Sequence, residues 1–259
     1  MIANYHTHTP RCGHADGVER AYLDRALAGG FRVLGFSDHS PYFFEGGYRS
    51  RIRMNPEELE GYVAALTELR EEYRGRIELR IGLEAEYYPR LFPRLTDYLA
   101  QFPIEYLILG QHGLFNEQEG IWTGTPTTEE RLLDQYCGQT AEALDTGYFL
   151  YFAHPDILHF VGDPAVYDRH MRRLCRKARD LGVPLEFNLL GFWERKQYPN
   201  PVFWRIAAEE GCSAVLGCDA HHPEDTWLPE LEKKARELLL ACGIPEPLER
   251  LKIKEHFMK

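Results

Sequence analysis

The amino-acid sequence predicts an α/β fold in which helices surround a barrel of parallel strands. Short apolar runs alternate with longer segments of helical period, which is the pattern of repeated βα units around a parallel sheet. The length of 259 residues exceeds that of most single domains, but it suits an α/β barrel. No Ser-, Gly- or Pro-rich linker divides the chain, so we expect one domain over residues 1–259.

Seven apolar runs qualify as strands, and a segment of helical period follows each of them. The predicted strands are Ile2–Tyr5, Arg32–Ser37, Ile77–Ala85, Tyr106–Gly110, Phe149–Ala153, Pro184–Asn188 and Ala214–Cys218. The predicted helices are Val18–Ala28, Pro56–Tyr73, Arg94–Gln101, Thr128–Asp145, Ala165–Leu181, Pro201–Glu210 and Glu230–Ala241. Asn200 precedes Pro201, as expected of a capping side chain before a proline in the first helical turn. The longest irregular segments, Ser40–Asn55 and Asn116–Thr127, are predicted to be loops near a functional site.

Composition narrows the classes of function. The net charge of -10 and the lack of a Lys/Arg run argue against an extended nucleic-acid surface, so a small ligand is expected. The six cysteines form no CxxC pair, which favours reduced thiols over a disulfide framework. The first residues lack a basic region followed by an apolar run, and no stretch approaches 18 apolar residues. We therefore expect a cytoplasmic protein that is not inserted in a membrane.

Side chains that can bind metal lie at the carboxyl ends of the predicted strands. In order along the chain they are His6, His8, Asp38, His39, Glu84, Glu86, His112, His154, Asn188, Asp219, His221 and His222. The carboxyl ends of the strands converge on one face of a parallel barrel, so these scattered residues should form one site. Imidazole and carboxylate ligands suit zinc, manganese and iron. About nine ligands would over-supply one ion, so we expect two or three ions, with Glu84 as the natural bridging carboxylate.

Other residues near these positions have more ordinary interpretations. Four acids are expected to orient ligand imidazoles or to cap helices, rather than to bind metal. They are Asp16, Asp38, Glu86 and Asp156. A group of aromatic side chains could either line the pocket or anchor a buried loop. They are Tyr42, Phe43, Phe44, Tyr48 and Trp122.

Taken together, six motifs resemble the polymerase-and-histidinol-phosphatase (PHP) family, and within it the histidinol phosphatase branch. They are HTHTPRCGHADG, FSDH, GLEAE, the histidine of GQHG, AHPD and GCDAHHPED. The motifs occur in the order typical of the family, and the resemblance extends from Ile2 to about Asp225. HxH alone would be weak evidence, but the set is highly specific.

The resemblance implies a distorted (β/α)7 barrel, similar to a TIM barrel, with a trinuclear metal site. Carried onto this sequence, the first metal takes His6, His8, Glu84 and Asp219, and the second takes Glu84, His112 and His154. The third takes His14, His39 and His221. The implied reaction is attack on phosphorus by a hydroxide that bridges two ions. In this scheme Glu84, Asp219 and His221 act in catalysis as well as in metal binding.

A phosphate ester also needs positive charge near its nonbridging oxygens. The candidates are Arg51, Arg53, Arg195 and Lys196. Arg51 and Arg53 match an arginine-bearing stretch that the resemblance associates with the family. The run DILHFVG after His154 has no Lys or Arg where the family pattern predicts a basic residue, and His159 is the candidate to replace it.

The leading hypothesis is a phosphoric monoester hydrolase that uses two or three divalent ions (Zn, Mn or Fe). Histidinol phosphate is the first substrate to test, which would place the protein in histidine biosynthesis. One alternative keeps the site but hydrolyses phosphodiesters or nucleotides; the acidic charge and the lack of a fused polymerase module count against it. Another is a barrel used as a scaffold or as a metal-binding module without turnover, which the complete ligand set disfavours. The sequence does not specify an oligomeric state.

Overall fold

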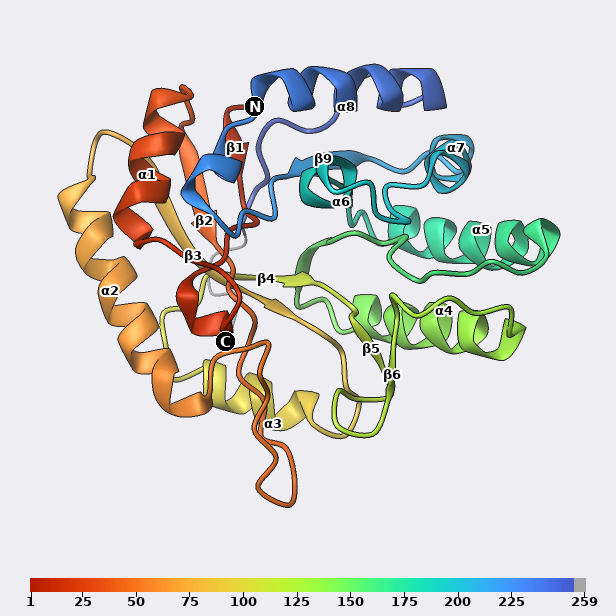
Figure 1. The fold of residues 1–259 in the computed structure, drawn as a ribbon, viewed down its shortest axis with the longest axis horizontal. Coiled ribbons are helices and arrows are strands. Elements are labelled where there is room, and N and C mark those ends of the chain that lie inside the picture. Colours follow the sequence, from red (N-terminus) through yellow and green to blue (C-terminus); the bar gives the residue numbers. More distant parts are fainter. Residues whose placement is uncertain (254–259) are drawn as a thin grey trace.

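Seven parallel strands form a curved sheet at the centre of the molecule (Figure 1). The computed structural model describes residues 1–253. In spatial order the strands are β1 (Ala3–Asn4), β2 (Val33–Phe36), β3 (Glu78–Ala85), β4 (Tyr106–Leu109), β7 (Phe149–Phe152), β8 (Leu185–Asn188) and β9 (Ala214–Gly217). All seven predicted strands are confirmed. The prediction of one domain over residues 1–259 extends to residues 254–259, which lie outside the described part of the chain.

The first and last strands meet just beyond their carboxyl ends and nearly close the sheet into a barrel. His8 N donates to Ala220 O at 2.9 Å, and Ala220 N donates to His6 O at 3.3 Å. Below this contact, the buried side chain of Asn4 joins the two edges, because its Oδ1 accepts hydrogen bonds from His6 N at 3.2 Å and Cys218 N at 3.0 Å. Closure therefore depends on a few polar contacts, and the barrel is distorted.

Helices cover the outside of the sheet (Figure 1). They are α1 (Glu19–Ala28), α2 (Leu59–Glu72), α3 (Phe92–Leu99), α4 (Glu130–Asp145), α5 (Pro164–Asp180), α7 (Pro201–Glu209) and α8 (Pro229–Cys242). Strands β2, β4, β8 and β9 are buried along their whole length, as expected for parallel strands covered on both faces. Asn200 Oδ1 accepts a hydrogen bond from Val202 N at 2.9 Å, which confirms the predicted start of α7.

The barrel interior beneath the functional face is filled by aromatic packing. The Tyr106 hydroxyl lies 2.9 Å from Tyr5 O and 3.1 Å from Phe36 O, and its single hydrogen is shared between these two acceptors. A Cβ atom on Gly82 would lie 2.4 Å from the Tyr106 ring, so glycine at this position makes room for the tyrosine. Side chains therefore fill the barrel interior, and the polar residues at the strand ends lie above this packed layer.

Short elements near the functional face were not predicted. Strands β5 (Gly113–Leu114) and β6 (Ile121–Trp122) form an antiparallel hairpin, and α6 (Leu189–Trp193) follows β8 directly. Three 3-10 turns are also present: η1 (Pro10–Cys12), η2 (Pro56–Glu58) and η3 (Pro223–Thr226). Two-residue strands are too short to show a period, which explains why the prediction treated Asn116–Thr127 entirely as a loop. Within residues 1–253, no helix combines the length and apolar character needed to cross a lipid bilayer.

Candidate metal centre

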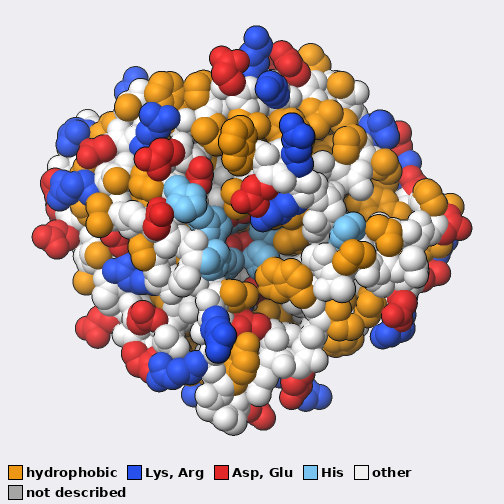
Figure 2. Space-filling view, viewed as in Figure 1, with side chains coloured by type: hydrophobic (Ala, Val, Ile, Leu, Met, Phe, Trp, Pro, Cys, Tyr) orange, Lys and Arg blue, Asp and Glu red, His pale blue; other side chains and the backbone are white. Residues whose placement is uncertain are grey.

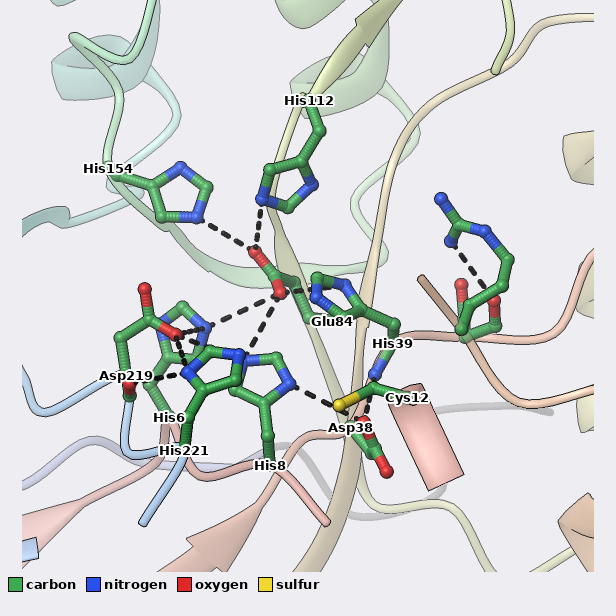
Figure 3. A network of polar contacts seen from close by, with 12 residues as sticks. His6, His8, Cys12, Asp38, His39, Glu84, His112, His154, Asp219 and His221 are labelled. Carbon is green, nitrogen blue, oxygen red and sulfur yellow. Dashed lines mark hydrogen bonds and ion pairs between the residues drawn. The ribbon is translucent and has the colours of Figure 1, made fainter. Parts of the chain in front are cut away.

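The predicted ligands gather at the carboxyl ends of the strands, and Figure 3 labels all of them except His14. They are His6, His8, His14, His39, Glu84, His112, His154, Asp219 and His221. In Figure 3 the imidazoles of several loops and strand ends point toward the two carboxylates, Glu84 and Asp219. His14 lies at the exposed rim, where its ring centroid is 4.8 Å from that of His221 and 5.3 Å from that of His39.

Glu84 lies between two sets of imidazoles. Its Oε1 is 2.9 Å from His154 Nε2 and 3.5 Å from His112 Nε2. Its Oε2 is 3.1 Å from His39 Nδ1 and 3.5 Å from His6 Nε2. A carboxylate whose two oxygens face different ligand sets has the arrangement needed to bridge two cations.

Asp219 provides the second carboxylate. Its Oδ1 is 3.0 Å from His8 Nε2 and 3.4 Å from His6 Nε2. Its Oδ2 accepts a hydrogen bond from Asn188 Nδ2 at 3.0 Å. The φ of Asp219 is 52°, a left-handed conformation rarely adopted outside glycine, and such strain is typical of functional sites.

Several ligand atoms in this cluster are buried and make no hydrogen bond of good geometry within the described residues. They are Nε2 of His6, His8 and His221, Nδ1 of His39 and Oε2 of Glu84. The ligands form overlapping groups of three, and within each group the ligand atoms lie within 4.8 Å of one another. The groups include His6, His8 and Asp219; His6, Glu84 and His154; His8, His39 and Glu84; and His14, His39 and His221. Buried polar atoms that converge without partners are costly, and divalent cations would satisfy them together. The residues present therefore fit divalent metal ions with nitrogen and oxygen ligands.

A third buried acid, Glu186 on β8, contacts residues of the cluster without facing the proposed metal positions. Its Oε1 lies 2.8 Å from His6 Nδ1, and its Oε2 accepts hydrogen bonds from His154 N at 3.1 Å and Asn188 Nδ2 at 3.0 Å. The sequence analysis missed this residue. Its signal was an acidic side chain inside an apolar strand, because a buried carboxylate needs partners of this kind.

Two of the four predicted supporting acids contact ligand imidazoles. Asp38 Oδ1 is 3.4 Å from His8 Nδ1, and Glu86 Oε1 is 3.0 Å from His112 Nδ1. Such partners fix the ring orientation of a ligand histidine. The other two lie elsewhere: Asp156 accepts a hydrogen bond from the backbone of Asn200, and Asp16 pairs with His222 at the surface.

Two glycines leave space for the buried acids. A Cβ atom on Gly110 would lie 1.8 Å from Glu84 Oε1, and one on Gly217 would lie 1.7 Å from Glu186 Oε1. Any other residue at either position would displace the carboxylate. Each glycine lies on or directly after the strand that pairs with the strand of its acid, β4 beside β3 and β9 beside β8, so both form part of the centre without offering a ligand.

The electrostatics of the cluster keep its carboxylates ionised. Burial opposes the ionisation of Glu84 and Asp219, but neighbouring imidazoles hold the pKa of each carboxyl well below its usual range. The largest opposing contribution comes from His112 for Glu84 and from His6 for Asp219. Both carboxylates are therefore charged at neutral pH and available to a cation.

The imidazoles respond unequally to the same surroundings. Burial lowers the pKa of His8, but Asp219 and Asp38 outweigh it and raise the pKa to about 9. Burial and the neighbouring His8 lower the pKa of His221 to about 3. In the metal-free protein, crowded imidazoles thus share a limited number of protons, and metal ions would replace those protons.

A cavity of about 730 Å³ opens above the cluster. Figure 2 shows histidine side chains at the bottom of a hollow that hydrophobic and charged side chains border. His14, His39, His112 and His221 line it from the centre, and Trp122, Trp193, Glu194, Lys196 and Asp225 are among the residues that line it farther out. Its size suits a small ligand better than a polymer.

The candidate phosphate-binding residues lie at different distances from this cavity. Lys196 lines it, whereas Arg51, Arg195 and His159 do not. The role of these three in phosphate binding stays a prediction. Arg53 is buried, and its guanidinium donates two 2.8 Å hydrogen bonds to Glu86.

The Arg53 guanidinium also donates hydrogen bonds to two other residues. Its Nε donates to Glu117 Oε2 at 2.6 Å, and its Nη1 also donates to Ser40 O at 3.2 Å. Arg53 therefore ties the loop after β2 to the end of β3 and to the β5–β6 hairpin loop. Through Glu86 it also supports the orientation of His112.

Comparison with known proteins agrees with this geometry. The PHP domain model matches residues 4–189, which is more than half of the chain. The chain belongs to the PHP domain family. This match agrees with the resemblance that the six sequence motifs indicated.

PHP relatives of similar length carry names that bear on activity. The chain is 33% identical over 233 residues to a probable histidinol-phosphatase of Deinococcus radiodurans, covering 86% of this chain and 87% of the relative. It is 26% identical over 254 residues to the histidinol-phosphatase of Bacillus subtilis, covering 85% and 93% respectively.

A solved PHP structure confirms the fold. The crystal structure of histidinol phosphate phosphatase from Lactococcus lactis subsp. lactis, complexed with zinc, L-histidinol and phosphate, matches this chain with a TM-score of 0.75. The match covers 100% of this chain and 98% of the other at 18% sequence identity. The predicted distorted (β/α)7 barrel is therefore confirmed.

Proposed function

We propose that this PHP protein is a metal-dependent phosphomonoesterase and that its substrate is histidinol phosphate. The observation that carries the proposal is the convergence of buried imidazole nitrogens and carboxylate oxygens around Glu84, several of them without a hydrogen bond of good geometry, at the bottom of a cavity of small-molecule size. The names of the relatives from D. radiodurans and B. subtilis support the reaction. The L. lactis structure, which contains zinc, L-histidinol and phosphate, supports the substrate.

We assign the ligands to three ions, in agreement with the motif pattern. The first ion is assigned to His6, His8, Glu84 and Asp219; the second to Glu84, His112 and His154; the third to His14, His39 and His221. When bound, divalent ions (Zn, Mn or Fe) would neutralise charge on the phosphoryl oxygens and lower the pKa of water. Glu84, Asp219 and His221 face the cavity and are the residues that we place at the reacting phosphorus.

Lys196 is assigned to the phosphate group. It is the one Lys or Arg side chain among the described residues that line the cavity, and its Nζ lies 2.7 Å from Glu194 Oε2. A flexible ammonium can leave an exposed carboxylate for a dianionic phosphate at little cost, because exposed ion pairs contribute little to stability. Lys196 thus supplies the positive charge that the run after His154 lacks.

The decisive experiment is a substrate panel with metal-reconstituted protein. Stripped protein is loaded with Zn, Mn or Fe, and phosphate release is measured with histidinol phosphate, glycerol phosphates, p-nitrophenyl phosphate and mononucleotides. We expect the highest kcat/KM for histidinol phosphate, and we expect Glu84→Gln to lose both bound metal and activity. No phosphate release from any monoester would refute the proposal.

Two other outcomes would identify the alternatives. Release of mononucleotides from an oligonucleotide, without monoesterase activity, would make the protein a phosphodiesterase. Metal content near zero in the purified protein, measured by elemental analysis after reconstitution, would indicate a PHP barrel without catalytic function.

A further inference from the structure

Two tryptophans border the cavity from different parts of the chain. Trp122 ends β6 and is 50% exposed, and Trp193 ends α6 and is 63% exposed. Both line the cavity above the metal centre. The other two tryptophans of the chain have ordinary packing roles: Trp204 is fully buried, and Trp227 lies against Arg25, 5.0 Å from ring centroid to guanidinium carbon.

The Trp122 ring is held in a fixed orientation. It lies nearly parallel to the His112 ring, with centroids 5.6 Å apart and an interplanar angle of 17°. A Cβ atom on Gly124 would lie 2.7 Å from Trp122 Nε1, so the glycine lets the turn approach the indole closely. The ring is therefore pre-positioned at the cavity, with half of its surface exposed.

The charges farther from the centre favour a cation over an anion. Outside the proposed ligands, the fully charged side chains that line the cavity are Glu194, Lys196 and Asp225. Lys196 pairs with Glu194, so the net charge of these three groups is negative and comes from Asp225, one oxygen of which accepts a hydrogen bond from His222 N at 3.1 Å. Aromatic faces beside an excess carboxylate are the surroundings in which proteins bind flat organic cations.

We propose that Trp122, Trp193 and Asp225 form the subsite that selects the alcohol portion of the substrate, and that this portion carries a flat ring and a positive charge. The inference rests on the proposed phosphatase function, to which it adds the side chains that choose the leaving group. The phosphate faces the metal centre and Lys196, while the flat ring of the alcohol contacts the indoles and its cationic group faces Asp225. An ester of an uncharged alcohol fills the phosphate end alone and binds more weakly.

The kinetic test compares two esters in the metal-loaded enzyme. The readout is the ratio of kcat/KM for histidinol phosphate to kcat/KM for glycerol 3-phosphate, which carries no cation or ring. We expect Trp193→Ala and Trp122→Leu each to lower this ratio about tenfold, through loss of a cation–π or stacking contact. Trp193→Phe should retain much of it. Leu240→Ala is the matched control, because Leu240 is 61% exposed but lies outside the cavity. A wild-type ratio in both tryptophan variants would overturn the subsite.

A binding test separates this inference from the proposed reaction. L-histidinol, which lacks the phosphate, should quench the tryptophan fluorescence of the metal-loaded protein. The quench should disappear in the Trp122→Phe/Trp193→Phe double variant, although Trp204 and Trp227 remain. If the protein binds L-histidinol in this way but releases no phosphate from histidinol phosphate, the subsite stands and the proposed reaction fails. Hydrolysis with no quench and an unchanged ester ratio would leave the reaction standing and remove the subsite.

Discussion

Glu186 contacts three groups on which the metal centre depends, and none of those contacts involves a metal ligand atom. It fixes Nδ1 of His6, the backbone N–H of His154 and the side chain of Asn188, which in turn donates to Asp219. A change of charge at this position should therefore alter the orientation of several metal ligands at once.

Glu186→Gln should lower metal affinity about 10–100-fold, the range measured for partners of ligand histidines. The substitution keeps the shape of the side chain but removes the charge that makes His6 a better ligand. Affinity is measured by competition with a chelator. Glu142→Gln, an exposed acid on α4, is the control and should match the wild type. Equal affinities for both variants would show that Glu186 does not support the centre.

Arg53 and Arg51 stand two positions apart in sequence but differ in burial. Arg53→Ala leaves Glu86 buried without its guanidinium partner, so the free energy of unfolding should fall by about 3–5 kcal/mol. Arg51→Ala removes an exposed side chain and should change it by less than about 0.5 kcal/mol. Urea unfolding of the metal-free proteins measures both. Similar losses in the two variants would contradict the structural role of Arg53.

The ligands could be predicted from the sequence because most of them directly follow an apolar run, at the end of a strand that the pattern identifies. Glu186 was missed because it lies inside such a run rather than after it, and its one signal was an acidic side chain between the apolar residues Leu185 and Phe187. Arg53 was predicted as a phosphate-binding candidate because sequence does not report burial. The distinction between Lys196 and Arg195 depends on α6, which the sequence analysis did not predict.

At the scale of elements, one buried amide supports the backbone contacts that join the ends of β1 and β9. Asn4 accepts hydrogen bonds from the backbone of His6 and Cys218, and its Nδ2 donates to His6 O at 3.0 Å and to Thr7 Oγ1 at 2.9 Å. Strand pairing elsewhere uses backbone ladders, but the described part of this joint has only a short bridge at Thr7 and Ala220.

Asn4→Ala should lower the free energy of unfolding by about 1–3 kcal/mol for each buried N–H left without a partner. Two such groups, the backbone N–H of His6 and of Cys218, lose their acceptor. Denaturant unfolding is the measurement. Asn116→Ala, whose side chain accepts one hydrogen bond in a surface turn, is the control and should cost under about 1 kcal/mol. A loss at Asn4 no larger than at Asn116 would mean that other contacts close the barrel.

The main strands and helices were predictable because each has a period and a length that propensity rules recognise. The β5–β6 hairpin and α6 were not, since both are short and owe their conformation to contacts with the rest of the barrel. Gln139 of α4, for example, accepts a hydrogen bond from Phe115 N at 2.9 Å and donates to Tyr87 O at 2.6 Å, which are partners distant in sequence. These unpredicted elements are the ones that carry Trp122 and Trp193.

At the scale of the whole molecule, metal occupancy should set both stability and its dependence on pH. A ligand that binds only the folded state at 100 times its Kd adds about 2.7 kcal/mol. Chelation should therefore lower the Tm markedly, and re-addition of Zn or Mn should restore it. A Tm that does not respond to metal would contradict the assignment of the centre.

The metal-free protein should lose stability as pH rises from 6.5 to 9. The pKa of His8 is about 9 in the folded state against an ordinary value of 6.5, so its contribution is complete below pH 6.5 and is lost as pH passes 9. Thermal unfolding across this range, with chelator, measures the effect. Metal-loaded protein should show a flatter profile, because the ions replace the protons. A flat profile without metal would contradict the shift.

The near-closure of the barrel by β1 and β9 also determines when the ligands of the first ion can come together during synthesis of the chain. Of the four groups assigned to the first ion, His6 and His8 lie at the start of the sequence, Glu84 follows on β3, and Asp219 comes after β9. His6 and His8 meet Asp219 where Thr7 lies beside Ala220. A chain emerging from the ribosome cannot assemble this set until its last strand is made. The complete set for the first ion therefore forms late, whereas Glu84, His112 and His154, assigned to the second ion, all precede β9 in the chain.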